Sequence, residues 1–139
     1  MQVRENYASA ASRHVRDART LCEASRWDNA GYLAGYAVEC GVKAAVELAG
    51  VRLRRHLDDI PPKFLVLAAD LSLAARRYRL DMDPDVAAAQ NMWTTTLRYT
   101  ETGTLPARDA RDLVDGAERV FRRTVVAMVL DGLLERVPQ

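Results

Sequence analysis

The chain has 139 residues, of which 49% are hydrophobic and 28% are charged, and its formal net charge is +1. This length suits one domain with its own core, and the composition excludes disordered and fibrous classes. The near-neutral charge provides no global attraction to nucleic acid or to an anionic membrane, so we expect no membrane association and no DNA binding.

The first two helices are predicted from the spacing of small and apolar residues. These residues recur at steps of three and four over positions 7–22, which is typical of an amphipathic helix. Asp28 suits the N-cap of a second helix that ends at Gly50. The second helix is apolar nearly all round and is therefore predicted to be central. Gly31 and Gly35 bare one strip of its backbone, which we ascribe to close packing against the first helix.

Three further helices complete the predicted fold. The two prolines at 61–62 suit the first turn of a third helix that reaches Tyr78. Asp83, followed by proline, indicates the start of a short fourth helix that extends to about Thr94. After a polar loop, a long last helix spans residues 106–134. The pattern predicts an all-α, up-and-down bundle of about five helices in a single domain, with four of them long or medium and one short.

Assembly and location also follow from the apolar pattern. The last helix becomes apolar on more than one face over residues 125–134, and we expect a homodimer formed through the outer surfaces of the long helices. Cys22 and Cys40 have neither a metal-ligand spacing nor a disulfide framework, which predicts buried, reduced thiols. Charged residues interrupt every apolar stretch before it reaches bilayer length, and no signal segment is visible, so we expect a cytoplasmic protein.

One polar stripe marks the otherwise apolar second helix. Tyr32, Tyr36, Glu39 and Lys43 fall within about 60° of one another at ~100° per residue. Because the glutamate precedes the lysine by four residues, the stripe suits a semi-buried ion pair flanked by tyrosines. It also suits the wall of a binding pocket.

The segment around this stripe resembles the second-helix signature of HEPN domains, the nucleotide-binding helical domains of higher eukaryotes and prokaryotes. That signature pairs a glutamate with a lysine four residues later, as in the sequence YLAGYAVECGVKAA at 32–45. Residues 18–30 resemble the first helix and turn of the family, Arg55-His56-Leu57 resembles the histidine-leucine step after helix two, and Leu97-Arg98-Tyr99 resembles the arginine-tyrosine pair after helix four. The resemblance spans about residues 8–130, and its specificity lies in the combination.

The resemblance implies a dimeric module that binds a nucleotide or RNA. It implies membership of a prokaryotic toxin–antitoxin or defence pair, with a minimal nucleotidyltransferase as partner. We expect the ligand-binding residues to be Tyr36, Glu39, Lys43, His56, Arg98 and Tyr99. Glu39, Lys43 and Arg98 are expected to converge on one groove.

Catalysis is left open by the sequence. HEPN ribonucleases carry an arginine, four to six intervening residues and a histidine, and no histidine follows Arg98. One alternative function is therefore a metal-independent RNase toxin that uses Arg98 with Tyr99 or His56 in place of that motif. Another is a non-catalytic dimer scaffold. There is no Gly-rich phosphate loop, nucleophile elbow or carboxylate-histidine metal spacing, so we expect no cofactor and no metal, and the catalytic residues are unknown.

Each candidate residue also has a structural interpretation. Arg98 suits a helix-end arginine that binds free carbonyl groups, His56 suits a cap of the following turn, and His14 suits the surface. The larger aromatic residues favour core packing, which applies to Trp27, Tyr78, Trp93 and Tyr99. The arginine pairs at 76–77 and 122–123 suit an anionic site or a solvent-facing surface.

Overall fold

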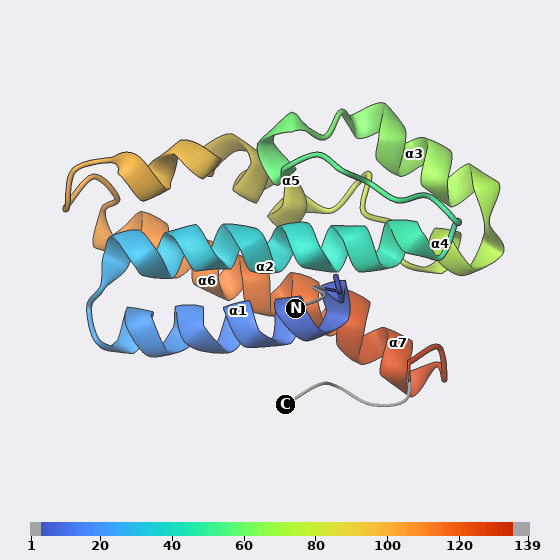
Figure 1. Cartoon of the computed structure of the whole chain (residues 1–139), viewed down its shortest axis with the longest axis horizontal. Coiled ribbons are helices and arrows are strands. Elements are labelled where there is room, and N and C mark those ends of the chain that lie inside the picture. The colour runs from blue at the N-terminus through green and yellow to red at the C-terminus, as the bar shows by residue number, and fades with distance from the viewer. Residues whose placement is uncertain (1–3, 135–139) are drawn as a thin grey trace.

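The computed structural model describes residues 4–134, and they form the predicted all-α bundle. Helices α1 (Tyr7–Glu23) and α2 (Trp27–Glu47) run antiparallel and side by side, and α6 (Ala107–Phe121) packs against both (Figure 1). Within the described range there is no strand, and no helix has the length and apolar character needed to cross a membrane.

Shorter segments surround this three-helix core. In chain order they are the 3₁₀ turn η1 (Leu57–Asp59), α3 (Pro62–Leu71), α4 (Leu73–Arg77), α5 (Pro84–Met92), the 3₁₀ turn η2 (Thr95–Tyr99), the π-helical turn η3 (Arg122–Val126) and α7 (Ala127–Leu130). The predicted third helix breaks at Ser72, whose hydroxyl accepts a hydrogen bond from the backbone N–H of Ala75 and so caps α4. The predicted last helix runs from α6 through η3 to α7, with Gly132 at a φ of 77° beyond its end.

Helix α2 is central, as predicted, and its glycines admit large side chains. A Cβ atom on Gly31 would lie 2.1 Å from the Leu105 side chain, and one on Gly35 would lie 2.1 Å from the Trp93 ring. The expectation that these glycines serve packing against the first helix is therefore wrong. Their neighbours come instead from the segments that lead into and out of η2. Cys22 and Cys40 are buried, as predicted.

The two aspartates predicted at helix starts have different outcomes. Asp83 is the N-cap of α5, and its side chain accepts hydrogen bonds from the N–H groups of Asp85 and Val86. Asp28 is not a cap, because α2 begins one residue before it. Its carboxylate accepts hydrogen bonds from the N–H groups of Gly103 and Leu105, which lowers the pKa of this carboxyl and ties the loop after η2 to α2.

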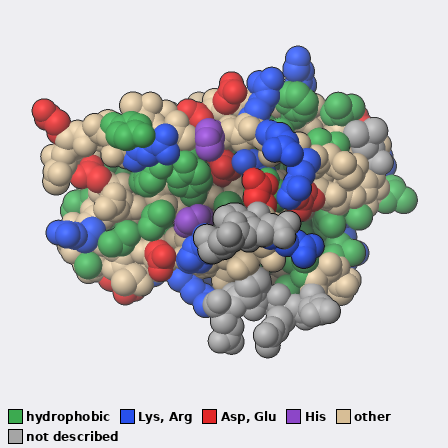
Figure 2. Space-filling view, viewed as in Figure 1, with side chains coloured by type: hydrophobic (Ala, Val, Ile, Leu, Met, Phe, Trp, Pro, Cys, Tyr) green, Lys and Arg blue, Asp and Glu red, His purple; other side chains and the backbone are tan. Residues whose placement is uncertain are grey.

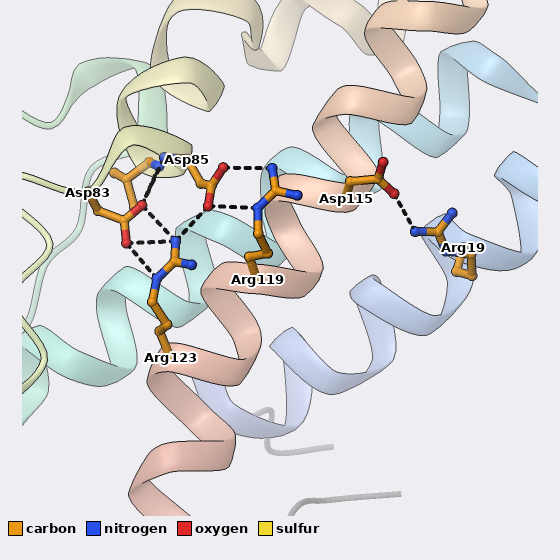
Figure 3. Close-up of polar contacts among 7 residues, drawn as sticks. Arg19, Asp83, Asp85, Asp115, Arg119 and Arg123 are labelled. Atoms are coloured by element: carbon orange, nitrogen blue, oxygen red, sulfur yellow. Dashed lines mark hydrogen bonds and ion pairs between the residues drawn. The ribbon is translucent and has the colours of Figure 1, made fainter.

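An arginine-carboxylate network joins α5 to α6 and η3 (Figure 3). The Arg123 guanidinium donates to both oxygens of Asp83 and to Asp85, at distances of 2.7–2.9 Å. The Arg119 guanidinium donates through two nitrogens to Asp85, at 2.9 and 3.0 Å. On the side of α6 that faces α1, Arg19 pairs with Asp115. The Arg119 and Arg123 contacts fix the position of α5 on α6, and the Arg19 contact joins α1 to α6.

Candidate functional site

The Glu39 carboxylate lies at the centre of the candidate site, in the middle of α2. Its side chain is only 5% exposed. One oxygen, Oε1, accepts a hydrogen bond from the Leu57 N–H at 2.6 Å and lies 3.2 Å from His56 Nδ1. The other, Oε2, lies 3.2 Å from Lys43 Nζ. The predicted ion pair is thus present, and the same carboxylate also holds the connection between α2 and α3.

His56 is oriented by this carboxylate. Because an ionised carboxylate only accepts hydrogen bonds, Nδ1 of His56 is the donor in this contact, and in the neutral tautomer that makes it Nε2 is the acceptor. The backbone beside His56 is held from α5, where the Gln90 amide donates to the carbonyl groups of Leu57 and Ile60 at 3.1 and 3.0 Å. The histidine precedes η1 but makes no side-chain capping bond, so the capping interpretation is wrong.

Lys43 is buried beside Tyr7. Its Nζ atom lies 5.4 Å from the centroid of the Tyr7 ring, and the Tyr7 hydroxyl donates to Glu5. Burial, followed by that hydrogen bond, raises the pKa of Tyr7 to about 12. Glu39 and Lys43 therefore expose little surface to a ligand. They position the residues around them.

Aromatic rings form a continuous cluster over Glu39. The Tyr36 ring centroid lies 5.0 Å from that of Trp93, 5.1 Å from Tyr32, 5.8 Å from His14 and 6.1 Å from His56. Figure 2 shows both histidine side chains, in purple, on one face of the molecule with hydrophobic side chains between them. Trp93 is anchored because its Nε1–H donates to the Tyr32 carbonyl oxygen at 2.9 Å.

Two pKa values within the cluster are displaced. Burial, followed by the hydrogen bond with the Tyr32 hydroxyl, raises the pKa of Tyr36. Burial, followed by the nearby Arg13 charge, lowers the pKa of His14. At neutral pH the Tyr36 hydroxyl is therefore protonated and the His14 imidazole is neutral.

Arg98 and Tyr99 form the exposed end of the cluster, on η2. The Arg98 guanidinium carbon lies 4.8 Å from the Tyr99 ring centroid, and a hydrogen bond with the Tyr32 side chain raises the pKa of Arg98. Its contacts among the described residues are with these aromatic residues, and Arg98 forms no ion pair with Glu39. Tyr99 is 77% exposed, and its predicted core packing is wrong.

Sequence reasoning missed the place of His14. It was expected at the surface, yet it is half-buried against Tyr36. One signal was available, because His14 lies three residues after the buried Ala11 and four before the buried Ala18, on the inward stripe of α1. We call the rings of His14, Tyr32, Tyr36, His56 and Tyr99, together with the Arg98 guanidinium, the aromatic face.

The aromatic face combines groups that suit a planar, phosphate-bearing ligand. Exposed rings stack on bases, the guanidinium fork binds phosphate, and an oriented imidazole exchanges protons. Residues 4–134 contain no cluster of three or more histidine, cysteine or acidic side chains placed to hold a metal ion. Comparisons with protein-family models, curated proteins and solved structures find no significant match to this chain.

Proposed function

We propose that this chain is a HEPN-like binding module whose aromatic face binds the base and phosphate groups of a nucleotide or RNA. The single observation that carries the proposal is the exposed pair of Arg98 and Tyr99 beside a partly buried, hydrogen-bonded ring cluster. Tyr99 offers a ring for stacking, and Arg98 offers donors that its contacts with Tyr32 and Tyr99 hold in place.

Binding of a fluorescent single-stranded RNA and of ATP tests this proposal. Replacing Tyr99 by Ala should weaken binding about tenfold, because stacking of one base on an aromatic ring is worth about 1–3 kcal/mol. Arg98→Ala should cause a similar loss, while both variants keep the helical circular dichroism spectrum and melting temperature of the parent. Arg108→Ala, an exposed arginine in the first turn of α6, is the matched control. Equal weakening by all three variants would show diffuse charge attraction only.

We also propose a minimal nucleotidyltransferase as the protein partner, within a prokaryotic toxin–antitoxin or defence pair. The support is the resemblance of the helix-two segment and its flanking motifs to HEPN domains. The test is co-purification of the tagged chain with the product of the adjacent gene. An adjacent gene that encodes no nucleotidyltransferase would remove the basis for this partner.

A second function, metal-independent RNA cleavage, is favoured by the contact between Glu39 and His56. In this reaction Nε2 of His56 accepts the proton of a ribose 2′-hydroxyl, and the 2′-oxygen forms a bond to phosphorus. The bond from phosphorus to the 5′-oxygen breaks, and the 5′-oxygen takes a proton from water. The products are a 2′,3′-cyclic phosphate and a 5′-hydroxyl end.

Incubation of labelled RNA with excess chelator separates cleavage from binding. His56→Ala should reduce cleavage by about 100-fold or more, the usual contribution of a general base, and leave RNA affinity within a small factor. His14→Asn compares the two histidines of the aromatic face and should leave cleavage in place. His14 contacts the same Tyr36 ring but, unlike His56, forms no ion pair with a carboxylate among the described residues. Absence of a cyclic phosphate product from the parent protein would exclude this second function and leave the binding proposal standing.

A further inference from the structure

A cluster of cationic side chains surrounds a pocket at the N-terminal end of α5. The pocket has a volume of about 420 Å³ and lies between the end of α4, the start of α5 and η3. We call it the arginine pocket. Its walls include Arg77, Arg79, Arg122, Arg123, Tyr78 and Asp131. A volume of this size falls within the range of small-molecule sites, about 300–1,000 Å³.

The charges of the arginine pocket are arranged in two layers. The side chains of three of its arginines are between 43% and 67% exposed, whereas their carboxylate partners are between 5% and 23% exposed. The pairs are Arg77 with Asp131, Arg79 with Asp81 and Arg123 with Asp83. A ligand that enters from solvent therefore meets mainly guanidinium groups, although Asp83 and Asp131 also line the pocket.

The guanidinium groups keep donors for a ligand. Each guanidinium has five N–H donors, and the contact of Arg77 with Asp131 is made through one nitrogen at 3.2 Å. Asp131 also accepts from the Tyr78 hydroxyl at 2.5 Å, so its oxygens are directed toward the protein. Arg122 lines the pocket without an ion pair to any residue within 4–134.

Two consecutive arginines of the π-helical turn η3, Arg122 and Arg123, line the pocket. Here the turn η3 widens the helix, and the Thr124 hydroxyl donates to the Val120 carbonyl at 2.7 Å inside it. A π-turn within a helix is often found at a functional site. The carboxylates of Asp83 and Asp85 then hold Arg123 in place (Figure 3).

We propose that the arginine pocket binds the phosphoryl group of a small phosphorylated molecule. A phosphate has several oxygens, so it can accept hydrogen bonds from Arg77 of α4 and from Arg123 of η3 together. These two arginines share no carboxylate partner. Guanidinium groups suit this geometry because their forks match phosphate oxygens in pairs. The site is separate from the aromatic face and shares no residue with it.

Calorimetric titration with pyrophosphate and with AMP, in 150 mM salt, tests the arginine pocket. Arg122→Ala should weaken pyrophosphate binding about tenfold or more, because charge-assisted hydrogen bonds contribute about 1.5–3 kcal/mol each. Arg122→Lys should lose affinity to an intermediate extent, since the charge remains and the fork is lost. Arg108→Ala, on the exposed first turn of α6, should leave the affinity unchanged.

The two ligands distinguish the source of the phosphoryl group. If AMP binds more tightly than pyrophosphate, the natural ligand is a nucleotide or a similar phosphate ester. If pyrophosphate binds equally or more tightly, the pocket recognises the phosphoryl group alone. Either result supports the proposal. The proposal is overturned if the parent protein binds neither ligand at about 1 mM, or if Arg122→Ala and Arg108→Ala weaken binding equally. A loss caused by Arg98→Ala with Arg122→Ala unaffected also overturns it, because binding then belongs to the aromatic face.

Discussion

Glu39 combines three contacts on two oxygen atoms in a buried position, and this makes it sensitive to substitution. Glu39→Gln keeps an acceptor for the Leu57 N–H but leaves the Lys43 charge buried without its partner. We expect the free energy of unfolding to fall by about 3–5 kcal/mol, the usual cost of breaking a buried ion pair. Urea denaturation followed by circular dichroism measures this loss.

The double variant Glu39→Gln/Lys43→Met tests whether the unpaired Lys43 charge causes the loss of stability. It removes both members of the pair, so it should recover part of the lost stability. If the double variant is no more stable than Glu39→Gln alone, the unpaired lysine is not the cause of the loss.

Two glycines on different helices make a matched pair of substitutions. Gly35→Ala places a methyl group where the Trp93 ring lies, 2.1 Å away, and Trp93 is itself buried. We expect a loss of about 1–3 kcal/mol from overpacking. Gly116→Ala meets nothing closer than 3.5 Å, so it should be neutral or add up to about 1 kcal/mol through helix propensity. Thermal denaturation of both variants checks the contrast, and equal stability of the two would contradict the close approach of Trp93.

At the scale of elements, the attachment of α5 to α6 should depend on pH. The hydrogen bond from Arg119, and to a smaller extent that from Arg123, holds the pKa of Asp85 below its usual value of 3.8. Because the folded pKa lies below the unfolded one, this contact contributes stability above about pH 4 and loses it as the pH falls through the folded pKa.

Replacement of Arg119 by Ala removes the main cause of this shift. We expect a loss of roughly 1 kcal/mol at pH 7, since the arginine is half-exposed, and a difference from the parent that narrows as the pH falls below about 4. Unfolding curves over this range provide the measurement. Arg108→Ala is again the control, and its free energy of unfolding should differ from that of the parent by the same amount at every pH. A difference that stays constant with pH would mean that Asp85 ionisation is not involved.

At the scale of the whole molecule, we propose a homodimer that uses the exposed end of the last helix. Most apolar residues of α2 are buried within the chain itself, so they offer little free surface. Leu130 is 82% exposed on α7, and Leu133 beyond it is also exposed. This apolar end is the part of the predicted dimer surface that the fold leaves open.

Sedimentation velocity tests the dimer. The parent protein should sediment as a dimer at micromolar concentration, and Leu130→Asp should shift it to a monomer without loss of helicity. Leu67→Asp, at an exposed position on α3, should leave the dimer intact. A monomeric parent would contradict the proposal outright.

The sequence by itself determined the elements that depend on neighbours within a few residues. The steps of three and four marked the long helices, Asp83 marked the start of α5, and the four-residue spacing of Glu39 and Lys43 marked their ion pair. The fold class followed, because helices with apolar stripes and short connections pack as a bundle. These features are local, so periodicity and capping residues encode them.

Only the tertiary structure decided which distant residues meet. The contact of His56 with Glu39 joins residues 17 apart, and the bonds of Asp28 to Gly103 and Leu105 join residues 75 and 77 apart. The break at Ser72 and the π-turn η3 likewise could not be read from helical spacing. Such contacts depend on how the helices cross and on where the connecting segments return. The pattern of hydrophobic residues along one helix predicts which face is buried, but it does not specify which polar residue of another segment will contact that face.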